Sequence, residues 1–314
     1  MNILLLADQY KYRGWGHDYA WYWEKELFRE ELGRQGNVCF FGRGYDPEWE
    51  DWLQKKSLTQ IFDRYKKPDF LLIHIDLGTI KNYSDVSFND LNVPKVIILN
   101  DYFEDSFLLP SVQPFFEKYK FDLAFGYSGN VIKQFKKDNV GSFQYLLPRG
   151  VDTYIYRKLF VKKCYDVLAS YTTKRRIYPL RRKIHKMLAK MDVLSYTEGA
   201  FFDEAVLKTN QSRICINAGS CYAGFVNYRV IEVLSCGSFL LSERNDDFEF
   251  HGYQDGKHLV LFDDLSDLRE KIFYYLKHED ERERIANEGM RFVRENFSTR
   301  KQVSKFLSIL EEHL

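Results

Sequence analysis

One stretch in the second half of the chain restricts the fold more than any other. Residues 213–217 form an apolar run typical of a buried strand, residues 227–235 have the pattern of a short helix, and Gly237 precedes a second apolar run that reaches Ser242. Small residues fill the loop before the helix, among them Gly219, Ser220 and Gly224. Such a loop presents backbone N–H groups at the positive end of the helix dipole, where phosphate groups bind. The sequence therefore predicts a strand–loop–helix–strand unit with a diphosphate site at the start of its helix.

Two charged residues follow on the predicted helix. Arg229 and Glu232 are three positions apart, so they share one face. A carboxylate about one turn into the helix is placed to hydrogen-bond a ribose, which suits a nucleotide-sugar site. The alternative is that Glu232 pairs with Arg229 or faces water.

Short apolar runs alternate with helical stretches along the rest of the chain, which is the pattern of doubly wound α/β sheets. Near residue 150, Pro148 and Gly150 interrupt this alternation. The sequence predicts two Rossmann-like domains, residues 1–150 and 151–298, facing each other across a cleft, and a last helix at 299–314. Strands are expected at residues 3–7, 38–41, 70–75, 96–99, 123–127, 143–147, 167–170, 193–195, 213–217, 238–242 and 258–262, and helices at 18–34, 48–66, 130–137, 178–190, 203–208, 227–235, 265–277, 279–295 and 299–313.

Charge and cysteine content exclude several classes of protein. With 46 basic and 45 acidic residues the net charge is +1, so no overall field favours nucleic acid. The five cysteines are odd in number and include no Cys-x-x-Cys, which indicates reduced thiols, argues against zinc and predicts a cytoplasmic protein. The N-terminal run has no basic leader, and no apolar stretch is long enough to span a bilayer. We therefore expect neither a secretory signal nor a transmembrane segment.

Ligands of open α/β sheets bind outside the carboxyl ends of the strands, so the loops that follow strands hold the candidate catalytic residues. His17 follows the first predicted strand in Gly14-Trp-Gly-His17, and Asp101 follows the strand at 96–99. We interpret both as candidate catalytic residues, with Asp76 a further candidate. His17 has a competing interpretation as a residue that packs at the start of a helix. Tyr19 stands where a dinucleotide fingerprint would have its third glycine, so that fingerprint is absent.

A basic cluster, residues 174–176, follows the strand at 167–170. After a strand, such residues are candidates for phosphate binding, although a water-facing loop is an equal alternative. A second basic cluster, residues 181–183, is interpreted as a solvated helix face. The candidates in the first cluster are Lys174, Arg175 and Arg176, and those in the second are Arg181, Arg182 and Lys183.

The segment Tyr228-Arg-Val-Ile-Glu-Val-Leu-Ser-Cys-Gly-Ser-Phe-Leu-Leu, with residues 248–268, 283–293 and 147–152, resembles the CgeB-like group of glycosyltransferases. This group is related to the glycosyltransferase-4-like enzymes, which have the GT-B fold. Good similarity covers residues 147–293, whereas the first half matches by layout alone. The resemblance implies that Glu232 contacts the donor ribose, that residues 174–176 contact phosphate, and that the last helix packs on the N-terminal domain. It also places the donor diphosphate at the loop formed by residues 219–227. With the start of the helix included, the candidate donor-binding residues here are Gly219, Ser220, Gly224, Asn227, Tyr228 and Arg229.

One position departs from the family pattern. Related enzymes have a second glutamate eight positions before the ribose-binding one, and Gly224 occupies that position here. The departure leaves the transferred sugar and the stereochemistry open.

Glycosyl transfer must stabilise a departing diphosphate. The sequence contains no Asp-x-Asp to hold a metal, so Arg, Lys and a helix N-terminus are expected to do this. The sequence predicts a metal-independent glycosyltransferase, a hexosyl or related transferase of class EC 2.4, with no cofactor besides its nucleotide-sugar substrate. The acceptor is a glycan, a lipid, a protein or a small molecule. Two alternatives stay open: an inactive nucleotide-sugar-binding or structural protein of the same fold, and a Rossmann oxidoreductase or epimerase.

Overall fold

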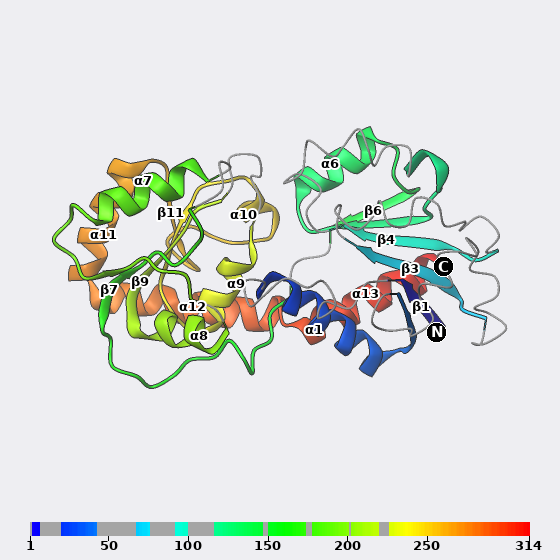
Figure 1. The fold of residues 1–314 in the computed structure, drawn as a ribbon, viewed down its shortest axis with the longest axis horizontal. Coiled ribbons are helices and arrows are strands. Elements are labelled where there is room, and N and C mark those ends of the chain that lie inside the picture. Colours follow the sequence, from blue (N-terminus) through cyan, green and yellow to red (C-terminus); the bar gives the residue numbers. More distant parts are fainter. Residues whose placement is uncertain are drawn as a thin grey trace. The chain divides into compact units, whose positions relative to one another are not determined.

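The structure is a computed structural model, and it describes residues 2–6, 20–42, 67–75, 92–99, 116–146, 150–173, 178–200, 202–219 and 226–314. The predicted helix at 48–66 lies outside these residues. The chain divides into two compact units (Figure 1). Unit 1 comprises Met1–Pro148 with Val303–Leu314, and unit 2 comprises Arg149–Gln302.

Unit 1 contains a six-stranded parallel sheet in the order β2-β1-β3-β4-β5-β6. The described side chains of its central strands are almost fully buried, as expected for parallel strands covered on both faces. Its helices are α1 (Ala20–Gln35), α6 (Gly129–Lys137) and most of α13 (Thr299–His313). The strands are β1 (Asn2–Leu6), β2 (Asn37–Phe41), β3 (Phe70–Ile75), β4 (Lys95–Leu99), β5 (Leu123–Gly126) and β6 (Phe143–Leu146).

Helix α13 completes the core of unit 1 from the far end of the chain. Val303, Phe306 and Leu310 are fully buried and belong to the same hydrophobic cluster as the strands. The ring of Phe306 lies edge-on to Phe28 of α1 and to Phe125 of β5, with centroids 5.8 and 4.8 Å away. The last helix is therefore an integral part of this unit.

Unit 2 contains a five-stranded parallel sheet in the order β11-β10-β9-β7-β8. The strands are β7 (Tyr165–Leu168), β8 (Ser195–Tyr196), β9 (Ser212–Asn217), β10 (Leu240–Glu243) and β11 (Val260–Phe262). The helices are α7 (Pro179–Leu188), α8 (Phe202–Gln211), α9 (Tyr228–Ser235), α10 (Asp247–Phe250), α11 (Leu265–Lys277) and α12 (Glu279–Asn296).

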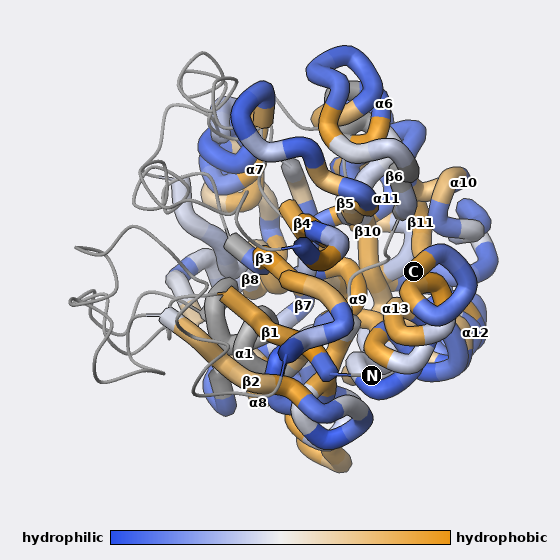
Figure 2. The backbone as a smooth tube through the Cα atoms, turned by 90° about the vertical axis from the view of Figure 1, so that its right-hand side faces the viewer, coloured by the Kyte–Doolittle hydropathy of each residue, from blue (hydrophilic) through white to orange (hydrophobic). Residues whose placement is uncertain are grey.

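The core of unit 2 consists of two hydrophobic clusters that include residues of its strands. One is centred on α9 and α12, and the other on α7 and α11. Figure 2 shows β10 and β11 as hydrophobic stretches and hydrophilic residues along α12. In this order β8 lies on one side of β7, whereas β9, β10 and β11 lie on the other. The carboxyl ends of β7 and β9 are therefore the topological switch point, where ligands of such sheets bind.

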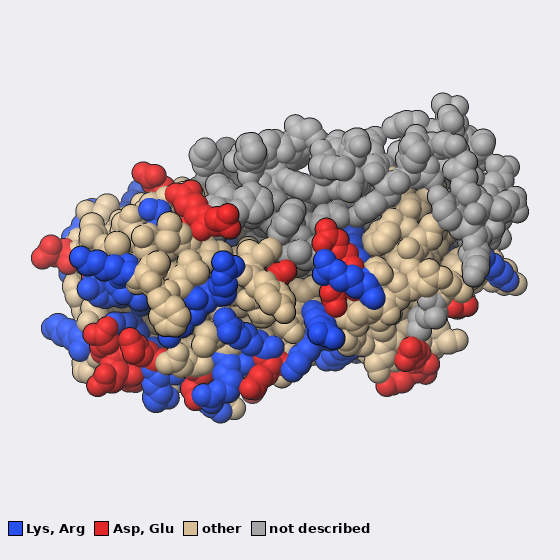
Figure 3. Space-filling view, turned by 90° about the horizontal axis from the view of Figure 1, so that it is seen from below, with Lys and Arg blue, Asp and Glu red and all other residues tan. Residues whose placement is uncertain are grey.

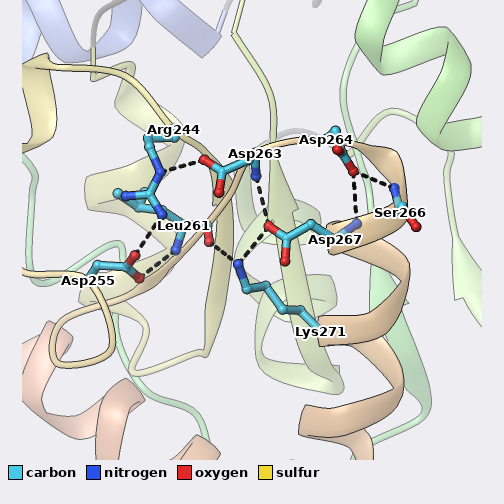
Figure 4. A network of polar contacts seen from close by, with 8 residues as sticks. All are labelled: Arg244, Asp255, Leu261, Asp263, Asp264, Ser266, Asp267 and Lys271. Carbon is cyan, nitrogen blue, oxygen red and sulfur yellow. Dashed lines mark hydrogen bonds and ion pairs between the residues drawn. The ribbon is translucent and has the colours of Figure 1, made fainter.

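The α/β fold class is confirmed, and several element boundaries agree closely with expectation. Helix α11 spans the predicted residues, and the side chain of Asp264 caps it by accepting hydrogen bonds from the backbone N–H groups of Ser266 and Asp267. Figure 4 shows this cap beside the ion pairs of Arg244 with Asp255 and Asp263. Strands β7 and β8 were predicted two residues away from their observed positions. Within the described part of the chain, no helix is long and apolar enough to cross a membrane.

Candidate functional site

Polar groups converge at the switch point of unit 2. Tyr171 follows β7, Ala218 and Gly219 follow β9, and Glu243 ends β10. Because these strands are parallel and adjacent, their carboxyl ends meet at one edge of the sheet. We call this set, together with the first turn of α9, the switch-point site.

The start of α9 is tied to the sheet by amide side chains. The Nδ2 group of Asn227 donates to Oδ1 of Asn217 at 3.0 Å, and Nδ2 of Asn217 donates to Oγ of Ser242 at 3.0 Å. Asn227 is the N-cap residue in an extended conformation, yet its side chain makes no capping hydrogen bond to the helix. Its buried Oδ1 atom has no hydrogen-bond partner. The helix therefore begins at a fixed position with an unused acceptor beside its N-terminus.

Arg229 and Glu232 occupy the partly exposed face of α9, whereas Val230, Ile231 and Val233 are buried. No ion pair joins Arg229 to Glu232 in the structure, and neither side chain has a hydrogen bond within the described residues. The alternative in which the two residues neutralise each other is therefore not realised. Both charges remain available to a ligand at the start of the helix.

Arg181 is buried at this site, which corrects its interpretation as part of a solvated face. Its exposed fraction is 8%, and its Nε atom donates to the carbonyl of Ala218 at 2.8 Å. Its guanidinium lies over the ring of Tyr178 at 3.7 Å and near that of Tyr171 at 5.1 Å. The aromatic rings compensate for removing this charge from water. Arg181 thereby fixes the backbone where the loop after β9 begins.

The hydroxyl group of Tyr171 is buried without a hydrogen-bond partner. Burial raises the pKa of Tyr171, and the positive charges of Arg181 and Arg229 oppose this effect. The ring stacks on His185, with centroids 5.1 Å apart, and His185 Nε2 contacts the carbonyl of Ala169 at 2.8 Å. Tyr171 therefore presents a hydroxyl without a hydrogen-bond partner in a region that Arg181 and Arg229 make electrostatically positive.

Glu243 accepts a hydrogen bond from the backbone N–H of Gly219 at 2.9 Å. Burial raises the pKa of the Glu243 carboxyl above its ordinary value of 4.5, while the Gly219 N–H and Arg181 act in the opposite direction. A carboxyl whose pKa is higher in the folded state binds protons more tightly there. Its contribution to stability is therefore present at low pH and is lost as the pH rises through the folded-state pKa.

Replacing Glu243 by glutamine should remove this pH dependence. The amide oxygen still accepts from Gly219, but the buried charge is gone. Thermal unfolding of both proteins from about pH 4 to pH 8 should show a decline with rising pH that is smaller for Glu243→Gln than for the wild type. Equal slopes in the two proteins would contradict this role for the carboxyl.

The remaining predicted residues divide into two groups. Gly219, Asn227, Tyr228, Arg229 and Glu232 lie on the loop after β9 or on the first turns of α9, beside the switch-point site. Outside the described residues lie His17, Asp76, Asp101, Lys174, Arg175, Arg176, Ser220 and Gly224.

Sequence reasoning missed Tyr171, Asn217 and Glu243 as individual site residues, although their loops were expected to matter. The available signal was their position at the ends of adjacent strands. In the part of the chain that the structure describes, no group of three or more His, Cys, Asp or Glu side chains is arranged to hold a metal ion. Among the described cysteines Cys164 is exposed, Cys215 and Cys236 are buried, and burial raises the pKa of the Cys215 thiol to about 12.

Comparisons with known proteins bear on the family and on the fold. Residues 183–308 match a family model described as "Glycosyl transferase-like". No curated protein sequence matches the chain.

Solved structures match it over nearly its whole length. Anabaena HepE in complex with UDP-glucose has 12% identity and a TM-score of 0.69, covering 98% of this chain and 99% of that one. Sucrose-phosphate synthase from Thermosynechococcus elongatus has 11% identity and a TM-score of 0.66, covering 99% and 98%. A glycosyltransferase from Rickettsia africae has 11% identity and a TM-score of 0.63, covering 99% and 98%. Residues 183–308 thus have the sequence pattern of the glycosyl transferase-like family, and the chain as a whole has the GT-B glycosyltransferase fold.

Proposed function

We propose that the protein is a glycosyltransferase that holds a nucleotide-sugar donor at the switch-point site of unit 2 and transfers the sugar to an acceptor hydroxyl. The observation that carries this proposal is the start of α9. There a fixed helix N-terminus, the unpaired Arg229 and the unpaired Glu232 lie beside the carboxyl ends of β9 and β10.

Each group has a role in donor binding. The backbone N–H groups at the start of α9 and the guanidinium of Arg229 are placed for a diphosphate, because both present positive charge to the same region. Glu232 lies one turn further along and accepts hydrogen bonds from the ribose hydroxyls. Arg181 positions the loop after β9 through the Ala218 carbonyl.

In the reaction, the bond between the anomeric carbon and the diphosphate oxygen breaks, and a bond from that carbon to the acceptor oxygen forms. The nucleoside diphosphate leaves, and the acceptor proton passes to a base. We propose that main-chain amides and cationic side chains stabilise the leaving group without a metal ion, since the sequence has no Asp-x-Asp. His17 and Asp101 remain our candidates for the base. Lys174, Arg175 and Arg176 remain candidates for additional phosphate contacts.

A screen of nucleotide-sugar donors with the full chain tests the proposal. HepE was solved with UDP-glucose, so UDP-glucose is the first donor to use. We expect release of the nucleoside diphosphate with at least one donor, and the same rate after treatment with a metal chelator. Loss of activity on chelation would overturn the metal-free leaving-group chemistry.

Binding without turnover has a different meaning. If the protein binds a nucleoside diphosphate but neither hydrolyses a nucleotide sugar nor transfers its sugar, the result would favour the alternative of an inactive binding protein of the same fold. Gly224, in place of the second family glutamate, is the residue that favours this alternative. Stabilisation by NAD alone would instead favour an oxidoreductase or epimerase.

A further inference from the structure

Residues 153–164, which we call the linking segment, lead from the start of unit 2 into β7. In Figure 1 they run as a green coil along the lower edge of unit 2. The segment is tied down along its length. The backbone N–H of Leu159 donates to Oδ1 of Asn210 at 2.8 Å, and the Tyr156 carbonyl accepts from Oγ of Ser235 at 2.6 Å. The side chain of Tyr156 is buried in the core.

Other side chains of this fixed segment point outward. Phe160 is 99% exposed and Tyr154 is 85% exposed, and Val161 is also exposed. The backbone around Phe160 is anchored on both sides, by the hydrogen bond of Leu159 with Asn210 and by the bond from the Cys164 N–H to the Gln211 carbonyl at 2.7 Å. A large apolar ring is therefore held in water by a rigid support.

Positive charge surrounds these apolar side chains. Four basic residues lie between 157 and 163, and no acidic residue occurs from 153 to 165, although the chain as a whole has a net charge of only +1. Lys163 donates to the carbonyls of Asn210 and Ser212. Burial lowers the pKa of its ammonium group, and the negative charge of Glu283 opposes this effect. Figure 3, which shows the lower side of unit 2, has Lys and Arg side chains spread among uncharged surface, with acidic groups also present. The four bases are Arg157, Lys158, Lys162 and Lys163.

The linking segment and the switch-point site lie at opposite ends of the strands. The segment meets the amino ends of β7 and β9, as the bond from Lys163 to the Ser212 carbonyl shows. The switch-point site is at the carboxyl ends of the same strands. A surface bound by the segment would therefore leave the proposed donor site uncovered.

We propose that the linking segment docks unit 2 on an anionic lipid bilayer. Phe160, Val161 and Tyr154 enter the interfacial region, and the flanking bases contact the phosphates of the head groups. A protein partner fits the observations less well. A stable interface needs about 800 Å² from each partner, and the exposed apolar surface here is confined to three side chains on one short segment. The four basic residues of the segment, with no acidic residue from 153 to 165, lie beside an exposed ring and match a negatively charged lipid surface.

Sedimentation with lipid vesicles tests the proposal on the full-length protein. We expect binding to phosphatidylcholine vesicles that contain phosphatidylglycerol, weakening with salt, and little binding to phosphatidylcholine alone. Phe160→Ser should weaken vesicle binding about tenfold, because the variant has no phenyl ring at this position to transfer from water into the bilayer. Lys162→Gln should weaken it roughly fivefold.

Two matched variants serve as controls in the same unit. Phe250→Ser removes another exposed phenyl ring, at the carboxyl edge of the sheet, and Lys183→Gln removes an exposed charge on α7. Both should bind vesicles like the wild type, and all four variants should retain UDP affinity. This readout separates the proposal from the proposed function, because vesicle binding does not depend on donor binding.

Three results would overturn the proposal. The first is no binding of the wild type to anionic vesicles. The second is equal loss in Phe160→Ser and Phe250→Ser. The third is a dimer in light scattering that Phe160→Ser dissociates while vesicles are not bound, which would assign the segment to a second copy of the chain.

Discussion

Replacing Gly289 with alanine should destabilise unit 2 by about 3 kcal/mol, because α12 has no room for a methyl group at this position. A Cβ atom on Gly289 would lie 2.2 Å from the carbonyl oxygen of His258 and 2.9 Å from Cδ2 of Leu234. The nearer atom belongs to the backbone just before β11, so a change of rotamer cannot relieve the overlap. Helix α12 must move away from β11 and α9, which opens the core there. For a domain of this size the expected fall in melting temperature is roughly 6–12 °C.

A second helical glycine provides the matched control. Among the described residues, a Cβ atom on Gly33 of α1 would meet the ring of Phe40, at 3.3 and 3.4 Å, and a ring edge can shift. Both substitutions gain about 1 kcal/mol of helix propensity, so their difference isolates the steric term. Gly33→Ala should change stability by less than about 1 kcal/mol.

The positions of the tryptophans allow the two units to be followed separately. All five precede Leu53, so tryptophan fluorescence reports on unit 1, whereas far-ultraviolet circular dichroism reports on both. Gly289→Ala should lower the transition seen by circular dichroism more than the one seen by fluorescence. Equal transitions for Gly289→Ala and Gly33→Ala would show that the close approach of α12 is not needed for stability.

Replacing Glu232 with alanine should weaken nucleotide binding by about 2 kcal/mol, or roughly thirtyfold in Kd. In the proposed complex the carboxylate accepts hydrogen bonds from ribose hydroxyls, and charged hydrogen bonds of this kind are among the stronger ones. The side chain is partly exposed and has no ion pair within the described residues. Because alanine is a better helix former than glutamate, the melting temperature should not fall.

A double cycle separates a ribose contact from a general electrostatic effect. Calorimetric titration with UDP and with 2′,3′-dideoxy-UDP should show a large loss from removing the hydroxyls in the wild type and a small one in Glu232→Ala. Glu270→Ala, which removes an exposed carboxylate from α11, should behave like the wild type. Equal losses in both proteins would place the ribose elsewhere.

The sequence predicted the parts of the fold that depend on local pattern. The ends of α11 and α13 were predictable because Asp264 is a strong cap signal and because the apolar spacing of α13 fits a single buried face. The shift of β7 and β8 has a physical reason. Tyr165 and Asp166 are polar enough to suggest a loop, yet β7 begins at Tyr165. The carboxylate of Asp166 accepts a hydrogen bond from the backbone N–H of Leu194, which lies just before β8.

The candidate site was predictable only where it is continuous in sequence. Arg229 and Glu232 were identified because they lie on one short helix, whereas Arg181 was misread because it stands in a run of three basic residues, of which Lys183 is exposed. Its burial depends on Tyr178 and on the carbonyl of Ala218, which is 37 residues away. Glycine is required at position 289 for the same reason, because the backbone atom that a Cβ there would meet lies outside α12. Such contacts follow from tertiary packing, and no local pattern encodes them.

A crystal structure of the full chain with UDP-glucose tests the central claim most directly. The account predicts the diphosphate within hydrogen-bonding distance of the first turn of α9 and of Arg229, and the ribose hydroxyls on Glu232. A nucleotide bound away from the carboxyl ends of β7 and β9 would contradict it.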